Sequence, residues 1–368
     1  MGRVGIVTWY KNGNYGGSLQ AFAMAKTLEK FGINPIFINH YHRNRLARTA
    51  KRLGFGMLYP QSAKSRNKIF HFAKKRLPET KTMRGLEQMA AYARDLDAVI
   101  CGSDQIWNSK SGANPIFFLQ FASAEKRIAY APSIGLPEIA DEYLETFREY
   151  VSSIPHLSVR ETYAAAYIQE KTGIVPKVVL DPTLLLEREE WLALASDRVC
   201  RERKLKKKGY ILCYFLGDHH KYAPFVREME KKTGYPVYYI STGKRDFKAK
   251  HLVCDPLEFA GLLGEAAYVL TDSFHGLVLS STIGTPVAVF ERFSQTDRYN
   301  ENSRIYSIVE LLGLKALVKP DATAVEDFMN QDHAKNDALV MRKQAALREE
   351  SLRFLESSLE AVLKHSLQ

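Results

Sequence analysis

The chain has 368 residues, which exceeds the usual size of one domain, so its length predicts two. Its apolar fraction of 46% is ordinary for a globular protein, and no stretch approaches the ~20 apolar residues that a membrane-spanning helix needs. The first residues run straight into a strand pattern, so we expect no signal peptide. The four cysteines lack disulfide or metal-site spacing, so we expect a reducing, cytoplasmic environment.

The net charge of +11 is concentrated in residues 41–85. This basic insertion contains 13 Lys and Arg and one acid, Glu79, whereas the rest of the chain has 39 basic and 40 acidic residues. Apolar side chains are interleaved with the charges: Leu53, Phe55, Met57, Leu58, Tyr59, Ile69, Phe70 and Phe72. The pattern suits an anionic membrane surface or a phosphate-bearing partner, and a solvated insertion explains it equally well. Nucleic acid is not an expected partner, because no known binding motif accompanies the charge.

Short apolar strands alternate with helical patterns along the first half of the chain. The predicted strands are residues 4–8, 35–39, 97–101, 127–131, 157–159 and 178–180. We expect helices at residues 18–31 and 86–94, and between the later strands. This alternation is typical of a parallel sheet covered by helices.

The alternation breaks at residues 200–209, where six of ten residues are basic, and then starts again. The later predicted strands are residues 210–216, 236–240, 251–253, 268–270 and 286–290, and the later helices are 222–232, a helix from 257, 275–283 and an amphipathic helix at 338–367. We expect the last helix to pack on one lobe or to cross back to the first; a coiled-coil partner is a less favoured alternative, because the apolar heptads are too few.

The pattern therefore predicts two Rossmann-like α/β lobes and a C-terminal helix. The expected divisions are an N-terminal lobe at 1–198 that carries the basic insertion, a linker at 199–209, a second lobe at 210–325 and a helical segment at 326–368. In such folds ligands bind between the lobes at the carboxyl ends of the strands, so the loops after strands are the candidate site.

The first of these loops is glycine-rich and includes Asn14, Tyr15, Gly16 and Gly17. Glycines allow a tight turn, and the free N–H groups at the start of the following helix attract a phosphate or carboxylate. The spacing fits neither a dinucleotide fingerprint nor a nucleoside-triphosphate loop. A purely structural turn remains an alternative.

The second loop, residues 101–108, follows a buried strand. Ser103, Gln105 and Asn108 surround Trp107, and this mixture suits a sugar, which takes hydrogen bonds from polar groups and stacks on an indole. Asp104 is a candidate general base, with capping of a helix as the alternative role.

Cationic and titratable groups follow three later strands. Arg160 offers a planar fork for a carboxylate or phosphate, although an ion pair with Glu161 explains it equally well. His275, at the start of a helix, is placed to donate a proton or bind phosphate. Three arginines follow in a polar loop and could contact an anionic substrate: Arg292, Arg298 and Arg304.

Five motifs occur in one order along the chain: NYGGSLQA at 14–21, GSDQIWN at 102–108, SVRE at 158–161, LDPTLL at 180–185 and TDSFHG at 271–276. Together, over roughly residues 4–314, they resemble the polysaccharide pyruvyl transferase family. The resemblance implies a two-lobed fold like that of B-type glycosyltransferases. It also implies transfer of the pyruvyl group of phosphoenolpyruvate to two hydroxyls of a hexose in a surface, capsular or extracellular polysaccharide. Phosphoenolpyruvate is then a co-substrate, and we expect no cofactor and no metal.

The resemblance also suggests roles for individual residues. It implies His275 as proton donor or phosphate-stabilising group and, more loosely, Asp104 as base. The expected donor contacts are Arg160, Gly16, Gly17, Ser273, Arg304 and Arg298, and the expected acceptor contacts are Asn14, Tyr15, Ser103, Gln105, Trp107 and Asn108. The best-understood members carry an arginine two residues before the histidine, where this chain has Ser273, so we expect Arg304 or Arg298 to replace it.

The basic insertion favours an acceptor linked to polyprenyl diphosphate at the inner face of the cytoplasmic membrane. A nucleotide-sugar glycosyltransferase of the same fold is the alternative enzyme, and a non-catalytic, membrane-peripheral carbohydrate-binding protein is the alternative class. The sequence does not indicate the acceptor sugar or the oligomeric state.

Overall fold

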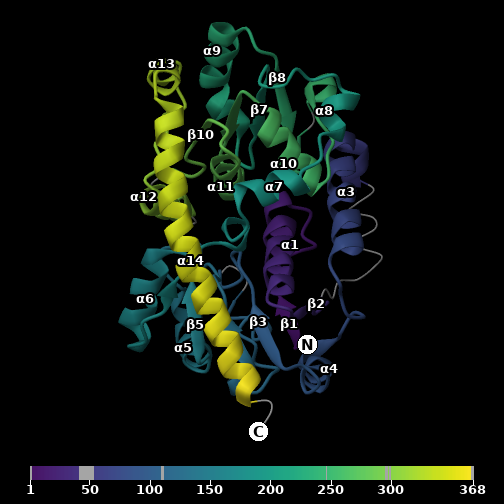
Figure 1. Ribbon diagram of the computed structural model, residues 1–368, viewed down its shortest axis with the longest axis vertical. Helices are drawn as coiled ribbons and strands as arrows, with labels where there is room; N and C mark the ends of the chain where they lie inside the picture. The colour runs from purple at the N-terminus through teal and green to yellow at the C-terminus, as the bar shows by residue number, and fades with distance from the viewer. Residues whose placement is uncertain are drawn as a thin grey trace.

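The computed structural model describes residues 2–40, 54–108, 112–245, 247–294, 297 and 300–365. Two parallel sheets form its framework (Figure 1). The first has the order β2-β1-β3-β4-β5-β6 and comprises β1 Arg3–Val7, β2 Asn34–Phe37, β3 Ala98–Cys101, β4 Arg127–Ala129, β5 His156–Val159 and β6 Lys177–Val178. The second has the order β10-β9-β7-β8 and comprises β7 Ile211–Tyr214, β8 Val237–Ile240, β9 Tyr268–Thr271 and β10 Val287–Val289. The prediction of two Rossmann-like lobes is confirmed.

Helices and short 3₁₀ turns connect the strands of each sheet. Around the first sheet they are α1 Tyr15–Lys30, α4 Gly85–Ala93, η2 Ala124–Lys126, α5 Asp141–Ser152, α6 Thr162–Thr172 and η3 Pro182–Leu184. Around the second they are η4 His219–Tyr222, α9 Ala223–Thr233, η5 Lys248–Lys250, α10 Pro256–Glu265, α11 Phe274–Ile283, α12 Ser303–Leu312 and α13 Ala324–Met329. Strands such as β3 and β7 are buried throughout, which explains their continuous apolar runs.

Two differences from the sequence prediction have a visible cause. Helix α1 begins at Tyr15 rather than at residue 18, because the side chain of Asn14 caps it by accepting the Gly16 N–H at 2.9 Å. The prediction of a strand at residues 251–253 is wrong. His251 forms only an isolated bridge to β8, because the chain turns into α10, which Asp255 caps.

The chain passes to the second lobe earlier than the predicted linker at 199–209. Helices α7 (Arg188–Leu194) and α8 (Arg198–Glu202) both pack against α10, although they precede the first strand of that lobe. Val199 and Cys200 are buried, so the beginning of the predicted linker belongs to a packed helix.

Helix α14, His333–His365, runs along both lobes (yellow in Figure 1). Its buried face includes Val340, Leu355 and Leu359, and it packs against α11 and α12 at one end and against β3 and η2 at the other. Of the two placements expected for this helix, the structure shows the crossing one. Because α14 contacts elements of both lobes, it helps to fix the relative position of the lobes. No helix in the described ranges has the length and apolar character to cross a membrane.

The basic insertion contributes helix α3, Pro60–Arg76, which lies between α1 and α10. Ile69, Phe72 and Ala73 are buried, and the ring of Phe72 lies 5.5 Å from that of Phe22 on α1. The prediction of a purely solvated insertion is therefore wrong for α3, because one face of the helix is buried and only the opposite face is exposed. Residues 41–53 of the insertion lie outside the described residues.

Candidate active site

A small cavity opens between the lobes at the carboxyl ends of the strands, where the alternation of strands and helices predicts a site. Its empty volume is about 420 Å³, part of which is open to solvent. The lining residues come from both lobes: Trp9, Asn12, Asn14, Asp104, Gln105, Leu216, Ser273, Phe274, His275, Arg292 and Arg304.

Two helices begin at this cavity. Asn14 caps α1 and Ser273 caps α11, where its hydroxyl accepts the Gly276 N–H at 3.4 Å, and both caps line the cavity. The N-terminus of a helix carries partial positive charge, so two of them favour an anion in the space between them.

His275 of the second lobe packs directly on Gly16 of the first. A Cβ atom added to Gly16 would lie 2.1 Å from His275 Nδ1 and 2.4 Å from its Cγ. Only a residue without a side chain therefore allows the imidazole to occupy this position. The sequence prediction placed an anion at Gly16, whereas the structure shows a histidine against it and its N–H bonded to Asn14.

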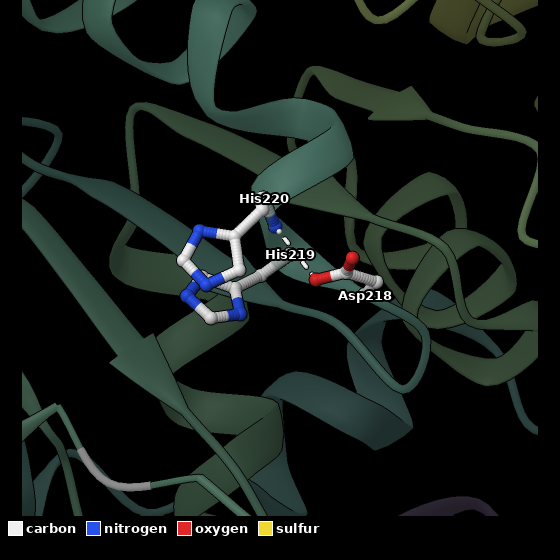
Figure 2. A group of neighbouring side chains, drawn as sticks. All are labelled: Asp218, His219 and His220. Carbon is white, nitrogen blue, oxygen red and sulfur yellow. Dashed lines mark hydrogen bonds between the residues drawn. The ribbon is translucent and has the colours of Figure 1, made fainter.

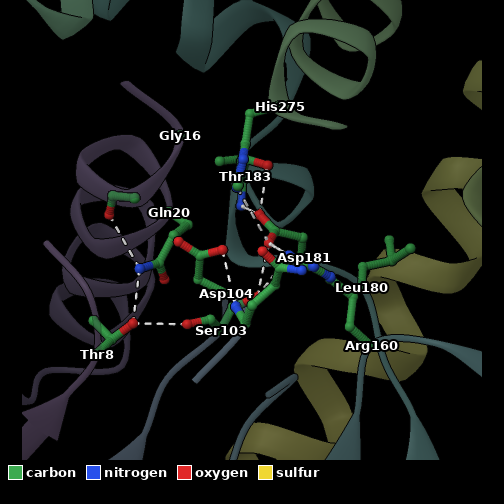
Figure 3. A network of polar contacts seen from close by, with 12 residues as sticks. Thr8, Gly16, Gln20, Ser103, Asp104, Arg160, Leu180, Asp181, Thr183 and His275 are labelled. Carbon is green, nitrogen blue, oxygen red and sulfur yellow. Dashed lines mark hydrogen bonds and ion pairs between the residues drawn. The ribbon is translucent and has the colours of Figure 1, made fainter. Parts of the chain in front are cut away.

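Behind His275 lies Asp181, a fully buried carboxylate (Figure 3). Its Oδ2 is 3.6 Å from His275 Nε2 and accepts hydrogen bonds from Ser103 Oγ at 2.7 Å and Arg160 Nη1 at 3.0 Å. Its Oδ1 accepts from the backbone and the hydroxyl of Thr183 at 3.0 and 2.7 Å. Asp181 thus connects the catalytic candidate of the second lobe to three groups of the first.

Burial by itself raises the pKa of Asp181, but His275, Arg160 and Thr183 together lower it well below its ordinary value. Asp181 is therefore a carboxylate at neutral pH. A fixed negative charge beside Nε2 orients the ring, and Nδ1 lies on the side of Gly16. Sequence reasoning included Asp181 in a motif but gave it no role.

Arg160 faces this carboxylate and not the cavity. Its guanidinium is 2% exposed, pairs with Glu161 at 3.0 Å and with Asp181 at 3.0 Å, and lies 4.2 Å from the ring centre of Phe274. Burial tends to lower the pKa of Arg160, but Glu161 and Asp181 raise it above its ordinary value. The expected direct contact with the donor is therefore corrected: Phe274 lines the cavity, and Arg160 packs behind it.

Asp104 lines the cavity in a strained backbone conformation. Its φ is +81°, which side-chain-bearing residues rarely adopt, and its Oδ1 accepts the N–H of Gln105 at 2.9 Å. Strain of this kind costs roughly 1–3 kcal/mol and is concentrated at functional sites. Asp104 follows β3 directly, so the loop places a carboxylate in the cavity where the sequence predicted a base.

The predicted acceptor contacts divide into two groups. Asn14 and Gln105 line the cavity. Ser103 lies behind it, where its hydroxyl donates to Asp181 and its carbonyl oxygen accepts from Thr8 at 2.7 Å. Asn108 is buried and does not line the cavity.

The two aromatic acceptor predictions are wrong because both rings are core residues. Trp107 is 1% exposed, stacks on Phe118 with ring centres 4.9 Å apart and donates its Nε1–H to the carbonyl of Phe117 at 3.0 Å. Tyr15 is fully buried, stacks on Phe259 of the second lobe at 4.7 Å and donates to the carbonyl of Cys254 at 2.9 Å.

Two of the three downstream arginines line the cavity. Arg292 donates from Nη2 to the carbonyl of Asp272 at 2.8 Å, and Arg304 donates to the Glu301 carboxylate at 3.1 Å. Burial lowers the pKa of Arg304, and the neighbouring Arg160 and Arg292 lower it further while Glu301 opposes the change. Because these cations disfavour one another, an anion bound between them would be stabilised. Arg298 lies outside the described residues.

Gly17, another predicted donor contact, does not line the cavity. A Cβ atom there would lie 2.6 Å from the carbonyl oxygen of Trp9, so the glycine is needed for the close approach of the first loop to α1.

A separate polar group lies on the loop after β7. Asp218, His219 and His220 each offer an atom that could hold a metal ion, and these atoms lie within 4.8 Å of one another. Figure 2 shows the two imidazoles together and the Asp218 carboxylate turned to the other side, where it accepts the His220 N–H at 3.1 Å. The expectation that the enzyme needs no metal stays a prediction.

Solved structures of similar fold include UDP-N-acetylglucosamine 2-epimerases and a protein in complex with UDP and glucose. UDP-N-acetylglucosamine 2-epimerase from Rickettsia bellii has a TM-score of 0.55 and 12% identity, over 97% of this chain and 96% of that one. Anabaena HepE in complex with UDP and glucose has a TM-score of 0.57 and 10% identity, over 98% and 100%. UDP-GlcNAc 2-epimerase from Methanocaldococcus jannaschii has a TM-score of 0.53 and 12% identity, over 90% and 94%. No curated protein matches the sequence significantly.

These similarities define the fold as the two-lobed architecture of B-type glycosyltransferases and the related epimerases. The sequence gives the more specific result. The family model of polysaccharide pyruvyl transferase matches residues 14–293, from the cap of α1 to the cavity arginine Arg292 and its neighbour. The chain belongs to the polysaccharide pyruvyl transferase family.

Proposed function

We propose that this protein transfers the pyruvyl group of phosphoenolpyruvate to two hydroxyls of a hexose in a surface-polysaccharide precursor, forming a ketal and releasing phosphate. One observation carries the proposal. His275 from the second lobe lies in a cavity that Asp104, Arg292 and Arg304 also line, with the Asp181 carboxylate behind its ring. The cavity thus combines a proton donor, a base and cations.

The donor is a small dianionic or trianionic molecule, so its site needs positive charge and little volume. Arg292 and Arg304 line the cavity, and α1 and α11 begin there. We assign the carboxylate and the phosphate of the donor to these groups, since arginine binds planar and tetrahedral anions in bidentate fashion. Ser273 contributes its position at the cap of α11 rather than a charge.

The chemistry begins with a proton. His275 protonates the methylene carbon of phosphoenolpyruvate, which makes C2 electrophilic, and a sugar hydroxyl adds to C2 while Asp104 takes its proton. The bond from C2 to the phosphate oxygen then breaks, and the second hydroxyl adds to C2 and closes the ketal. Of the two protons that the diol loses, one ends on the new methyl group and the other on phosphate, so both catalytic groups are restored.

Arg160 and Asp181 are positioning residues in this scheme. Asp181 Oδ2 is 3.6 Å from His275 Nε2, and Arg160 Nη1 donates to the same oxygen at 3.0 Å. The Asp181 carboxylate orients the His275 ring, and Arg160 holds that carboxylate in place.

The acceptor enters beside Asn14, Gln105 and Asp104, the polar residues of the first lobe that line the cavity. We propose a polyprenyl-diphosphate-linked oligosaccharide as its form and a peripheral position at the inner face of the cytoplasmic membrane for the enzyme. The basic insertion supports both proposals through its charge.

The test is a reaction of the full-length protein with phosphoenolpyruvate and a panel of lipid-linked oligosaccharides. We expect release of inorganic phosphate together with an acceptor whose mass has increased by one pyruvyl ketal. His275→Ala should lower turnover by ~10²-fold or more, because general acid–base groups contribute at least that much. Val175→Ala, an exposed change on the first lobe, is the control.

The glycosyltransferase alternative gives a different product pattern. The neighbours that bind UDP or act on UDP-sugars make it the second candidate. Incubation with UDP-sugars would then release a nucleotide and lengthen the acceptor, whereas phosphoenolpyruvate would stay intact. That outcome, or His275→Ala with more than about a tenth of the normal turnover, would overturn the proposal.

A further inference from the structure

One side of the molecule combines exposed apolar side chains with exposed basic side chains. Met57 and Leu58 are 85% and 72% exposed, the two highest values among the exposed large apolar residues described. They directly precede α3, whose exposed face carries four basic residues: Lys64, Lys74, Lys75 and Arg76. We call Met57, Leu58 and these four residues the α3 surface.

The insertion itself has little acidic charge to offset these basic residues. Between residues 54 and 85 the sequence has eight Lys and Arg and one acid, Glu79. Glu79 pairs with Lys11 and accepts a hydrogen bond from Tyr10 at 3.0 Å, so it is engaged with the first lobe. The α3 surface therefore presents a positive field to solvent, with two apolar side chains beside it.

We propose that the α3 surface docks on an anionic lipid bilayer, with Met57 and Leu58 entering the headgroup region and the α3 lysines contacting anionic headgroups. Charge complementarity favours an anionic bilayer over a protein partner. A protein that bound only Met57 and Leu58 would not need the basic, acid-poor helix beside them. Basic side chains with adjacent large apolar residues are the combination that binds bilayer surfaces.

Helix α3 is rigidly attached to both lobes, so docking would orient the whole enzyme. Lys68 pairs with Glu258 of α10 at 3.0 Å, and the Ser62 hydroxyl donates to the carbonyl of Arg245, both in the second lobe. Phe72 packs on Phe22 of the first. These contacts hold α3 against both lobes (α3 lies at the right of Figure 1).

The same helix also reaches the edge of the cavity. A Cβ atom on Gly13 would lie 2.8 Å from Arg66 Nε, so the Arg66 side chain packs against the loop whose Asn12 and Asn14 line the cavity. Its guanidinium also lies 5.0 Å from the ring centre of Phe55, two residues before Met57. A continuous set of contacts thus runs from the α3 surface to the cavity, and an acceptor anchored in the bilayer would be presented at its mouth. Presentation of the acceptor at the cavity rests on the proposed function, whereas docking of the α3 surface on the bilayer does not.

Vesicle co-sedimentation of the full-length protein tests the docking. The protein should bind vesicles of phosphatidylglycerol and phosphatidylcholine, bind those of phosphatidylcholine alone at least about tenfold more weakly, and release in high salt. Met57→Ser/Leu58→Ser should weaken binding by about tenfold or more, and Lys74→Gln/Lys75→Gln should weaken it and reduce its salt dependence.

The matched control is Val175→Ser/Leu192→Ser, which removes two exposed apolar side chains elsewhere, 69% and 50% exposed. It should bind vesicles like the unchanged protein. Equal binding by both serine double variants, or equal binding to both kinds of vesicle, would overturn the proposal. Because Met57 and Leu58 are exposed, their replacement should leave the melting temperature unchanged, so a loss of binding cannot be attributed to unfolding.

Activity separates this proposal from the proposed function. Met57→Ser/Leu58→Ser should retain phosphate release with a water-soluble acceptor fragment and lose it with acceptor embedded in vesicles. Vesicle binding without any reaction of phosphoenolpyruvate would leave the docking surface in place and refute the pyruvyl transfer. Full transfer to embedded acceptor by the double variant would refute the docking surface.

Discussion

Replacement of Gly16 by alanine tests the placement of His275 without touching a polar group. The new Cβ atom would lie 2.1 Å from His275 Nδ1, whereas ordinary contacts begin at 3.4 Å, so the ring must retreat by about 1.3 Å. A retreat of this full distance toward Asp181 is blocked, because Nε2 is 3.6 Å from the carboxylate and would come closer to it than a hydrogen bond allows. Gly16 is not among the residues with positive φ, so alanine suits the backbone of α1.

A displacement of about 1 Å in a catalytic group costs ~10²-fold in rate, so kcat of Gly16→Ala should fall by that factor. The steric conflict should also lower the free energy of unfolding by about 1–3 kcal/mol. Phosphate release under saturating substrates measures the first effect and urea denaturation the second. Gly243→Ala is the control, because its nearest neighbour, Ser241 Oγ, would lie at 3.8 Å.

A double variant identifies the cause of the loss. With His275→Ala already present there is no ring to displace, so adding Gly16→Ala should cause no further fall in kcat and should recover the lost stability. If folded Gly16→Ala keeps kcat within about threefold of the unchanged enzyme, the packing of His275 on Gly16 has no catalytic importance and our reasoning on the site fails.

Four other changes have expected outcomes. The lowered pKa of Asp181 means that its contribution to stability is present above the unfolded-state pKa of about 3.9 and is lost as the pH falls below it. Asp181→Asn should therefore lower the free energy of unfolding in urea at pH 7. The difference in this free energy between the variant and the unchanged protein should narrow below about pH 4, and a difference that stays constant with pH would contradict the assignment. Trp107→Phe should cost about 1 kcal/mol of stability through loss of its hydrogen bond to Phe117 and leave the acceptor KM unchanged, whereas a raised acceptor KM would restore a role in sugar binding. Arg292→Ala should raise the KM for phosphoenolpyruvate by ~10-fold or more, and an unchanged value in initial-rate assays would remove Arg292 from the donor site. EDTA should not change the rate. If EDTA removes activity, zinc restores it, and His219→Ala prevents that recovery, the Asp218–His220 group holds a required metal.

Sequence reasoning located the candidate site well where a single loop determines it. His275 and Asp104 each follow a strand directly, and the carboxyl ends of parallel strands meet at one edge, so their approach to one cavity could be predicted from chain order alone. The two-lobed fold was predictable for the same reason, since each short apolar strand is followed by a helical pattern.

Prediction failed where the contacts of a side chain are made with residues that are distant in the sequence. Trp107 stands among polar residues, which suggested a sugar, but its stacking partner Phe118 lies 11 residues later in a segment without a periodic signal. The sequence predicted that Arg160 binds a substrate anion, whereas in the structure Arg160 forms an ion pair with Asp181. Asp181 itself resembles an ordinary helix cap before a proline, and it does cap η3. Nothing in its local sequence distinguishes that role from its contact with His275.

The insertion shows why charge alone could not predict position. Its composition indicates an attached, solvated or membrane-facing segment, and on composition alone its deletion is a natural test of membrane binding. In the structure, Ile69 and Phe72 of α3 are buried between the lobes, so deletion would expose the core of both and could not test membrane binding. Point changes at Met57 and Leu58 are therefore the appropriate experiment.

The loss of the expected arginine at position 273 has a structural explanation. Ser273 caps α11 by accepting the Gly276 N–H at 3.4 Å, a task that an arginine side chain cannot perform, because it has no acceptor. The cation comes instead from the loop after β10, where Arg292 donates to the carbonyl of Asp272, the residue before Ser273. Gly217 makes this route available, since a Cβ atom there would lie 2.6 Å from Arg292 Cγ. The resemblance led us to expect Arg304 or Arg298 as the replacement, whereas the contact with Asp272 places Arg292 beside the vacant position. The chain thus has a positive charge at the start of α11 that comes from the loop after a different strand, so the proposed binding of an anionic donor does not require the arginine of the motif.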